Sequence, residues 1–202
     1  MKLYYSQGAC SLSVHIALYE SELPFESVLA STKTHKLTDG TDFYTINPLG
    51  YVPVLELNDG RRLRESAAIL QFIADQVPDK KLAPANGSFE RYQLQEWLNF
   101  IATEIHKSFS PLFAPGTPIE TKNSAKEKLQ NRLSWVNNEI KDKLYLMGKD
   151  FTVADAYLFN VTNWAKFVSV DLSNFEYILA YRASISEKQT VQAAMKTEGL
   201  IK

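Results

Sequence analysis

The sequence predicts two domains, a small mixed α/β domain followed by an all-helical domain. Strand-like and helix-like segments alternate over the N-terminal third, whereas the periodic segments from residue 88 onward are helical. Between them, residues 78–81 and 84–87 form a polar joint with two prolines and a glycine, a composition typical of domain boundaries. We therefore predict domains at residues 1–80 and 86–202, and 202 residues are enough for two small cores.

The overall composition excludes several classes of partner. With 22 Lys and Arg against 23 Asp and Glu, the net charge of −1 gives no electrostatic attraction to nucleic acid or to an anionic membrane surface. No run approaches the roughly 18 apolar residues that span a bilayer, and residues 1–10 lack the apolar core of a signal peptide. A single cysteine excludes an internal disulfide and a CxxC pair. We expect a cytoplasmic protein.

The first predicted strand, residues 2–6, leads through a short loop to Cys10 and a helix. The apolar positions of this helix are Leu12, Ile16 and Tyr19, spaced i, i+4 and i+7. Cys10 thus precedes a helix N-terminus, where the helix dipole lowers the pKa of a thiol and makes it reactive. The alternative is an inert, half-buried cysteine. His15, within the helix, is interpreted as packed or solvated.

A second strand is predicted at residues 25–29, followed by a polar loop at residues 31–44. The loop is longer than a plain connection needs and carries Lys33, His35 and Lys36. These side chains could hold a carboxylate, and the alternative is a solvated loop surface.

Residues 52–57 and 61–63 flank Asn58-Asp59-Gly60, a strong hairpin turn signal. Pro53 cannot donate to a sheet, so it must lie at an edge or a bend, and it is a candidate for a cis peptide bond. Val52 would then offer its N–H and C=O to an extended peptide.

Glu65 and Ser66 follow this hairpin and begin a helix. The free N–H groups of a helix start attract a carboxylate at Ser66, and Glu65 could pair with an ammonium group. Taken alone, the segment could also be an ordinary edge hairpin that leads into a helix.

The helical half begins with an apolar stripe and a polar line on one helix. The stripe comprises Leu94, Leu98, Ile101 and Ile105. The polar line, Asn99, Thr103 and His106, predicts the rim of a cleft, with a solvent face as the alternative. Prolines 111, 115 and 118 are expected to end this helix.

Further helices are predicted at residues 121–143, 156–167, 175–183 and 191–199. Thr152 and Asp155 form a capping-box pattern before one of them, so we assign them a structural role.

With these residues established, the chain resembles bacterial glutathione S-transferases of the beta class from Met1 to near its C-terminus. The segments that carry the resemblance are KLYYSQGACSLSVHIAL (2–18), NPLGYVPVL (47–55), RESAAI (64–69), YQLQEWLNFIATEIHKSFSPLF (92–113) and FTVADAYLF (151–159). The resemblance implies a thioredoxin-like N-terminal domain and an all-α C-terminal domain. It also implies a homodimer, with glutathione as co-substrate, bound between the domains, and no metal.

The resemblance also implies the roles of individual residues. Cys10 approaches the glutathione sulfur and His106 is its polar partner. Val52 pairs with the cysteinyl backbone, and Glu65 and Ser66 hold the γ-glutamyl end. The remaining residues expected at the glutathione site are Asn99, Thr103 and Glu104 from the helical domain, and His35. The family commonly has lysine at the position of His35, as a contact to the glycyl carboxylate.

The implied activity is conjugation of the glutathione thiolate to small hydrophobic electrophiles, in detoxification. Two alternatives stay open: glutathione-dependent thiol–disulfide exchange through Cys10, and non-catalytic binding of apolar ligands. Residues that could line an electrophile pocket are Phe109, Leu112, Phe113 and Trp164. The sequence does not name the electrophile.

Overall fold

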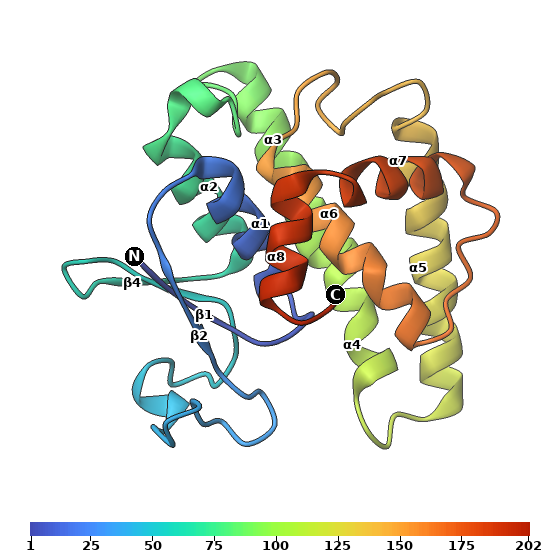
Figure 1. The fold of residues 1–202 in the computed structure, drawn as a ribbon. Coiled ribbons are helices and arrows are strands. Elements are labelled where there is room, and N and C mark those ends of the chain that lie inside the picture. The colour runs from blue at the N-terminus through green and yellow to red at the C-terminus, as the bar shows by residue number, and fades with distance from the viewer. The chain divides into compact units, whose positions relative to one another are not determined.

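The computed structural model describes all 202 residues, which form two compact units. The first comprises Met1–Leu82 together with Lys188–Lys202, and the second is Ala83–Glu187 (Figure 1). The junction falls inside the joint expected between residues 80 and 86. The last segment, which we expected in the helical domain, instead groups with the first unit.

The first unit is built on a four-stranded sheet with the order β2-β1-β3-β4. Its strands are β1 (Lys2–Tyr5), β2 (Glu26–Leu29), β3 (Val54–Glu56) and β4 (Arg62–Arg64). β1 pairs in parallel with β2, and the other pairs are antiparallel. Its helices are α1 (Ser11–Ser21), α2 (Ser66–Gln76) and α8 (Gln189–Thr197), with 3₁₀ turns η1 (Phe43–Thr45) and η2 (Pro78–Lys80). The mixed α/β prediction is confirmed.

The second unit is entirely helical, as predicted. Its elements are α3 (Phe89–Phe100), η3 (Ile101–His106), α4 (Lys107–Phe113), α5 (Ile119–Glu139), α6 (Val153–Thr162), η4 (Asn163–Phe167) and α7 (Glu176–Ser186). η3 is a wide π-helical segment that joins α3 to α4. The expectation that Pro111 ends the helix is wrong, because α4 continues through it to Phe113. A proline removes only one N–H donor, and the remaining bonds of the turn hold.

The capping box at the start of α6 is confirmed, and its carboxylate does more than cap. Asp155 is fully buried and accepts hydrogen bonds from the N–H groups of Thr152 (2.7 Å) and Leu146 (2.8 Å) and from the Tyr181 hydroxyl (2.9 Å). Burial raises the pKa of Asp155, against these hydrogen bonds, which lower it. Asp155 therefore joins three segments of the unit and has the structural role expected of it.

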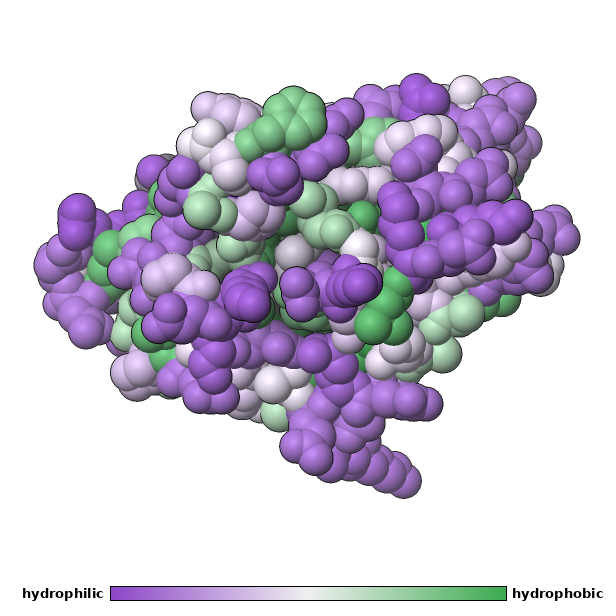
Figure 2. Space-filling view, turned by 90° about the horizontal axis from the view of Figure 1, so that it is seen from above, coloured by the Kyte–Doolittle hydropathy of each residue, from purple (hydrophilic) through white to green (hydrophobic).

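No helix combines the length and apolar content needed to cross a bilayer. Hydrophilic residues cover most of the face seen in Figure 2, with hydrophobic residues between them in small areas.

A buried polar link fastens α8 to the N-terminal segment of the first unit. Glu198, just after α8, accepts a hydrogen bond from the Gly8 N–H (2.8 Å) and lies 2.9 Å from Nδ1 of His15. The other ring nitrogen of His15 lies 2.7 Å from the Ser27 hydroxyl of β2. His15 and Glu198 are both fully buried, so His15 is packed, as interpreted from the sequence.

We expect Glu198→Ala to lower the free energy of unfolding by roughly 3 kcal/mol, because it leaves two buried donors without an acceptor. Urea denaturation monitored by circular dichroism measures this loss. Glu127→Ala, on the exposed surface of α5, is the control and should change stability by less than about 0.5 kcal/mol. Equal stability of the two variants would show that the link contributes little.

Candidate functional site

Hydrogen bonds within residues 6–13 fix the position of Cys10. The Ser11 hydroxyl bonds both the N–H and the C=O of Ser6, each at 3.2 Å. The Ser13 hydroxyl donates to the Cys10 carbonyl at 2.6 Å. With Gly8 held by Glu198, these bonds place Cys10 as the N-cap residue of α1, which confirms its expected position.

The Cys10 thiol is neutral at physiological pH. Burial raises its pKa to about 11, and hydrogen bonds from the Ser66 hydroxyl and from the first N–H groups of α1 lower it by less. The S–H group donates to the Val52 carbonyl, with Sγ and O 3.2 Å apart. The helix start lowers the pKa in the predicted direction, but desolvation outweighs it, so the net shift is upward and the expected reactive thiol is wrong.

Val52 lies where the sequence places it, immediately before a cis peptide bond to Pro53. Pairing between β3 and β1 begins only at Val54, so the backbone of Val52 lies outside the ladder. Its carbonyl accepts the Cys10 S–H, which puts the thiol beside an extended backbone segment that the sheet does not use.

Glu65 and Ser66 meet the same loop at the start of α2. Ser66 is buried and is the first residue of α2, close enough to hydrogen-bond the Cys10 thiol. Glu65 precedes it with φ 69°, and its Oε1 accepts from the Tyr51 hydroxyl at 2.8 Å. The first unit thus brings together a thiol, an unused strand edge, a helix start and a carboxylate.

His35 is connected to this group through the loop that carries Val52. Its Nδ1 lies 3.0 Å from the Gly50 carbonyl, two residues before Val52, and its ring packs on Tyr44 at a centroid distance of 4.6 Å. The ring is half-buried rather than free on a solvated loop.

His106, the last residue of η3, is oriented by two aromatic side chains of the second unit. Its Nδ1 lies 2.8 Å from the Tyr157 hydroxyl of α6, and its ring meets Trp164 edge to face at 4.8 Å. Wide π turns displace side chains from the regular helical spacing and recur at functional sites. Here the π turn contains His106, Thr103 and Glu104.

The other polar residues predicted on this helix make contacts within the second unit. The Thr103 hydroxyl donates to the Asn99 carbonyl at 3.0 Å. Glu104 accepts from Nε of Arg132 at 2.8 Å and lies 3.4 Å from Nζ of Lys128. The Arg132 guanidinium holds the pKa of Glu104 below its usual range, so this carboxylate is held by α5.

An aromatic cluster adjoins His106 and includes three of the four residues predicted for the electrophile pocket, Phe109, Phe113 and Trp164. Trp164 meets Phe109 at 5.6 Å and Phe113 at 5.9 Å, in both cases nearly perpendicular. Phe113 is 49% exposed, whereas Phe109, Leu112 and Trp164 are buried. Phe113 is thus the member of the cluster that can reach a ligand.

Sequence reasoning missed three residues that order these groups: Tyr51, Tyr157 and Glu198. Each contacts a residue at least 14 positions away, at Glu65, His106 and Gly8 respectively. No local motif signals such contacts.

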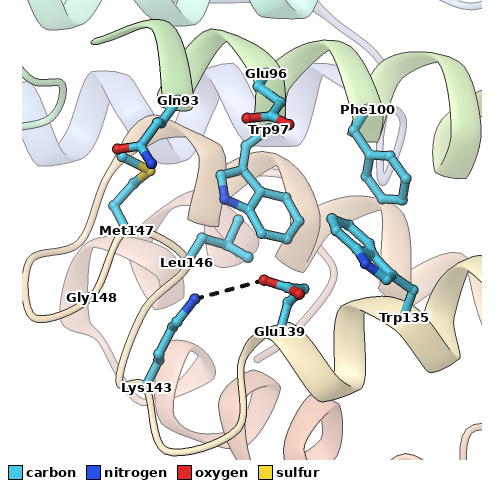
Figure 3. A pocket seen from close by; sticks show the side chains of 10 residues that line it. All are labelled: Gln93, Glu96, Trp97, Phe100, Trp135, Glu139, Lys143, Leu146, Met147 and Gly148. Carbon is cyan, nitrogen blue, oxygen red and sulfur yellow. Dashed lines mark ion pairs between the residues drawn. The ribbon is translucent and has the colours of Figure 1, made fainter. Parts of the chain in front are cut away.

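The second unit also has a hollow of about 300 Å³ (Figure 3). Aromatic side chains of α3 and α5 form its wall, and Glu139 and Lys143 face each other across its base. Its lining comprises Gln93, Glu96, Trp97, Phe100, Trp135, Glu139, Lys143, Leu146, Met147 and Gly148. None of the predicted site residues lines it, and we assign it no role.

Comparison with known proteins agrees with the two-unit architecture. A family model described as glutathione S-transferase, N-terminal domain, matches residues 8–76, and one described as glutathione S-transferase, C-terminal domain, matches residues 100–188. The chain is 46% identical to glutathione S-transferase GstA of Escherichia coli O157:H7 over 200 residues, covering 99% of this chain and 100% of the relative.

Two solved structures support the same assignment. A ternary complex of BphK, a bacterial glutathione S-transferase, matches with a TM-score of 0.97 and 51% identity, covering 98% of this chain and all of that one. A bacterial beta class glutathione S-transferase of Sphingomonas chungbukensis matches with a TM-score of 0.96 and 45% identity over the whole of both chains. The expected family and fold are confirmed.

The raised pKa of Cys10 predicts its alkylation kinetics. Because only the thiolate reacts, the rate constant with iodoacetamide should rise about tenfold per pH unit from pH 7 to 9.5, without a plateau. Intact mass gives the rate directly, since the chain has one cysteine. A short peptide with one cysteine and blocked ends, whose thiol pKa is about 8.5, is the reference and should level off in this range. A plateau for the protein below pH 8.5 would contradict the raised pKa.

Proposed function

Since the chain belongs to the glutathione S-transferase family, and resembles its beta class, we propose that it conjugates the thiolate of glutathione to small hydrophobic electrophiles. The observation that carries the proposal is the convergence of Cys10, Val52 and Ser66 in the first unit. The glutathione tripeptide offers a thiol, an extended backbone and a γ-glutamyl carboxylate, which match these three groups.

Each end of the tripeptide has a partner of matching chemistry. The backbone of Val52 lies outside the ladder and pairs with the cysteinyl backbone, as in strand addition. Ser66 and the first N–H groups of α2 receive the γ-glutamyl carboxylate, and Glu65 receives the ammonium group. His35 receives the glycyl carboxylate.

The central chemical task is to hold the glutathione sulfur as a thiolate at neutral pH. A free thiol has a pKa of about 8.5, and lowering it by one or two units requires only about 1.4–2.7 kcal/mol. The N–H groups at the start of α1 are donors suited to this role. Because Cys10 stays protonated, it does not place a second negative charge beside the glutathione sulfur.

The second unit contributes a polar and an aromatic part. His106 is the polar partner of the sulfur, held in orientation by Tyr157. Asn99, Thr103 and Glu104 belong to the border of the glutathione site. Phe113 and its aromatic neighbours receive the apolar electrophile.

We extend the proposal to the biological setting. The protein acts in detoxification in the cytoplasm, as a homodimer and without a metal. Its single cysteine fits a reducing compartment. No group of three or more His, Cys, Asp or Glu side chains comes close enough together to hold a metal ion.

The two alternative functions have less support. Thiol–disulfide exchange through Cys10 requires its thiolate, and burial raises the pKa of that thiol to about 11. Non-catalytic binding of apolar ligands accounts neither for the thiol nor for the helix start beside it.

Conjugation of 1-chloro-2,4-dinitrobenzene at millimolar glutathione, followed by absorbance, tests the function. We expect Ser66→Ala to raise KM for glutathione about tenfold or more, because a hydrogen bond to a charged group contributes about 1.5–3 kcal/mol. Ser124→Ala, on the exposed surface of α5, should leave KM unchanged. Absence of turnover in the unmodified protein at saturating glutathione would refute the proposal.

Replacement of Cys10 separates conjugation from exchange. We expect Cys10→Ala to retain part of the conjugation activity, because the N–H groups at the start of α1 remain. Any mixed disulfide formed with oxidised glutathione, seen as an added mass, should disappear in this variant. Complete loss of conjugation would instead give the Cys10 sulfur an indispensable part in it.

A further inference from the structure

Hydrogen bonds hold both the N–H and the C=O of His35, and these bonds restrict the direction in which its ring points. Its N–H donates to the Ser31 carbonyl at 2.9 Å, and its C=O accepts from the Phe43 N–H at 2.8 Å. The residue has φ 52°, a conformation uncommon outside glycine, and its ring packs on Tyr44.

The contact with Gly50 decides which nitrogen of His35 carries the hydrogen. Nδ1 lies 3.0 Å from the Gly50 carbonyl oxygen, and a carbonyl only accepts, so Nδ1 must be the donor. The approach is close: a Cβ at position 50 would lie 2.7 Å from Cε1 of Tyr44 and 3.0 Å from Nδ1 of His35, and φ there is +70°. Only glycine permits this contact without displacement.

The other ring nitrogen, Nε2, therefore carries no hydrogen when the imidazole is neutral and presents a lone pair. It makes no hydrogen bond within the chain, and the ring is half-exposed. A lone pair repels a carboxylate, whereas a protonated Nε2 donates a charge-assisted hydrogen bond to it.

We propose that His35 makes recognition of a ligand carboxylate depend on the uptake of one proton at Nε2. The inference rests on the proposed function, in which glutathione supplies that carboxylate at its glycyl end. A lysine at this position would be charged throughout the neutral range, so the histidine converts a constant attraction into one that strengthens as pH falls. Near neutral pH, the chain then discriminates weakly between glutathione and analogues without this carboxylate.

The charged and titratable neighbours of His35 do not produce the same dependence. Lys33 and Lys36 share its loop, Tyr44 packs on its ring, and Glu65 is held by Tyr51 in the segment after Gly50. Among these residue types, only histidine ordinarily changes charge between pH 5 and 8.

Calorimetry of S-methylglutathione binding between pH 5.5 and 8 tests the inference without turnover, and the methyl group removes the ligand thiol from the titration. We expect the Kd to increase about tenfold from pH 5.5 to 8. Repeating the titration in buffers of different ionisation enthalpy should show proton uptake on binding, about 0.4 proton on average over this range, as a tenfold change in Kd requires.

Two protein variants and one modified ligand isolate the contact between His35 and the glycyl carboxylate. His35→Lys should bind with a nearly constant Kd and take up no proton, and His35→Gln should bind weakly at every pH. The ligand esterified at its glycyl carboxylate should bind the unmodified protein without the pH dependence. Because the ester leaves His106 in place, it also separates the contribution of that residue.

The outcomes distinguish this inference from the function on which it rests. A Kd that stays constant with pH, or an equal pH dependence with the ester, overturns the role of His35 and leaves the proposed function intact. Absence of binding at every pH overturns both.

Discussion

The buried carboxylate of Glu198 is the constraint on which the organisation of the first unit depends. It receives the Gly8 N–H and faces His15, so the segment after α8 is tied to α1 and to the loop that leads to Cys10. Burial raises the pKa of Glu198 against the hydrogen bonds from His15 and Gly8. Breaking the contacts of a buried acceptor with its two donors costs free energy. The C-terminal segment therefore helps to hold the loop that positions the Cys10 thiol.

The position of Cys10 shows how competing physical effects decide a protonation state. A helix N-terminus favours a thiolate, but its contribution is typically 0.3–1 kcal/mol at an exposed site. Desolvation of a buried thiol is the larger effect here and raises the pKa to about 11. The S–H group then points at the Val52 carbonyl as a donor. The same start of α1 can stabilise the charge of a ligand sulfur while its own cysteine stays neutral.

The two units contribute different chemistry. The first supplies backbone and helix-start groups suited to a peptide, and its side chains are fixed by contacts such as Tyr51 with Glu65. The second supplies a histidine at the end of a π turn and an aromatic cluster with one exposed member, Phe113. The residues proposed to contact glutathione therefore belong to both units, whereas the exposed aromatic side chain of Phe113 belongs to the second alone.

The sequence by itself determined where most helices and strands lie, the capping box at Thr152 and the residues that carry the family resemblance, and it marked Pro53 as a candidate for the cis bond that the structure has. These features depend on local spacing or on the chemistry of one residue, which a linear pattern contains. Only the tertiary structure decided that α8 belongs with the first unit, that η3 is a π turn and that Cys10 is protonated. Each of these depends on burial or on contacts between distant residues, and burial is a property of the packed chain that no local spacing records.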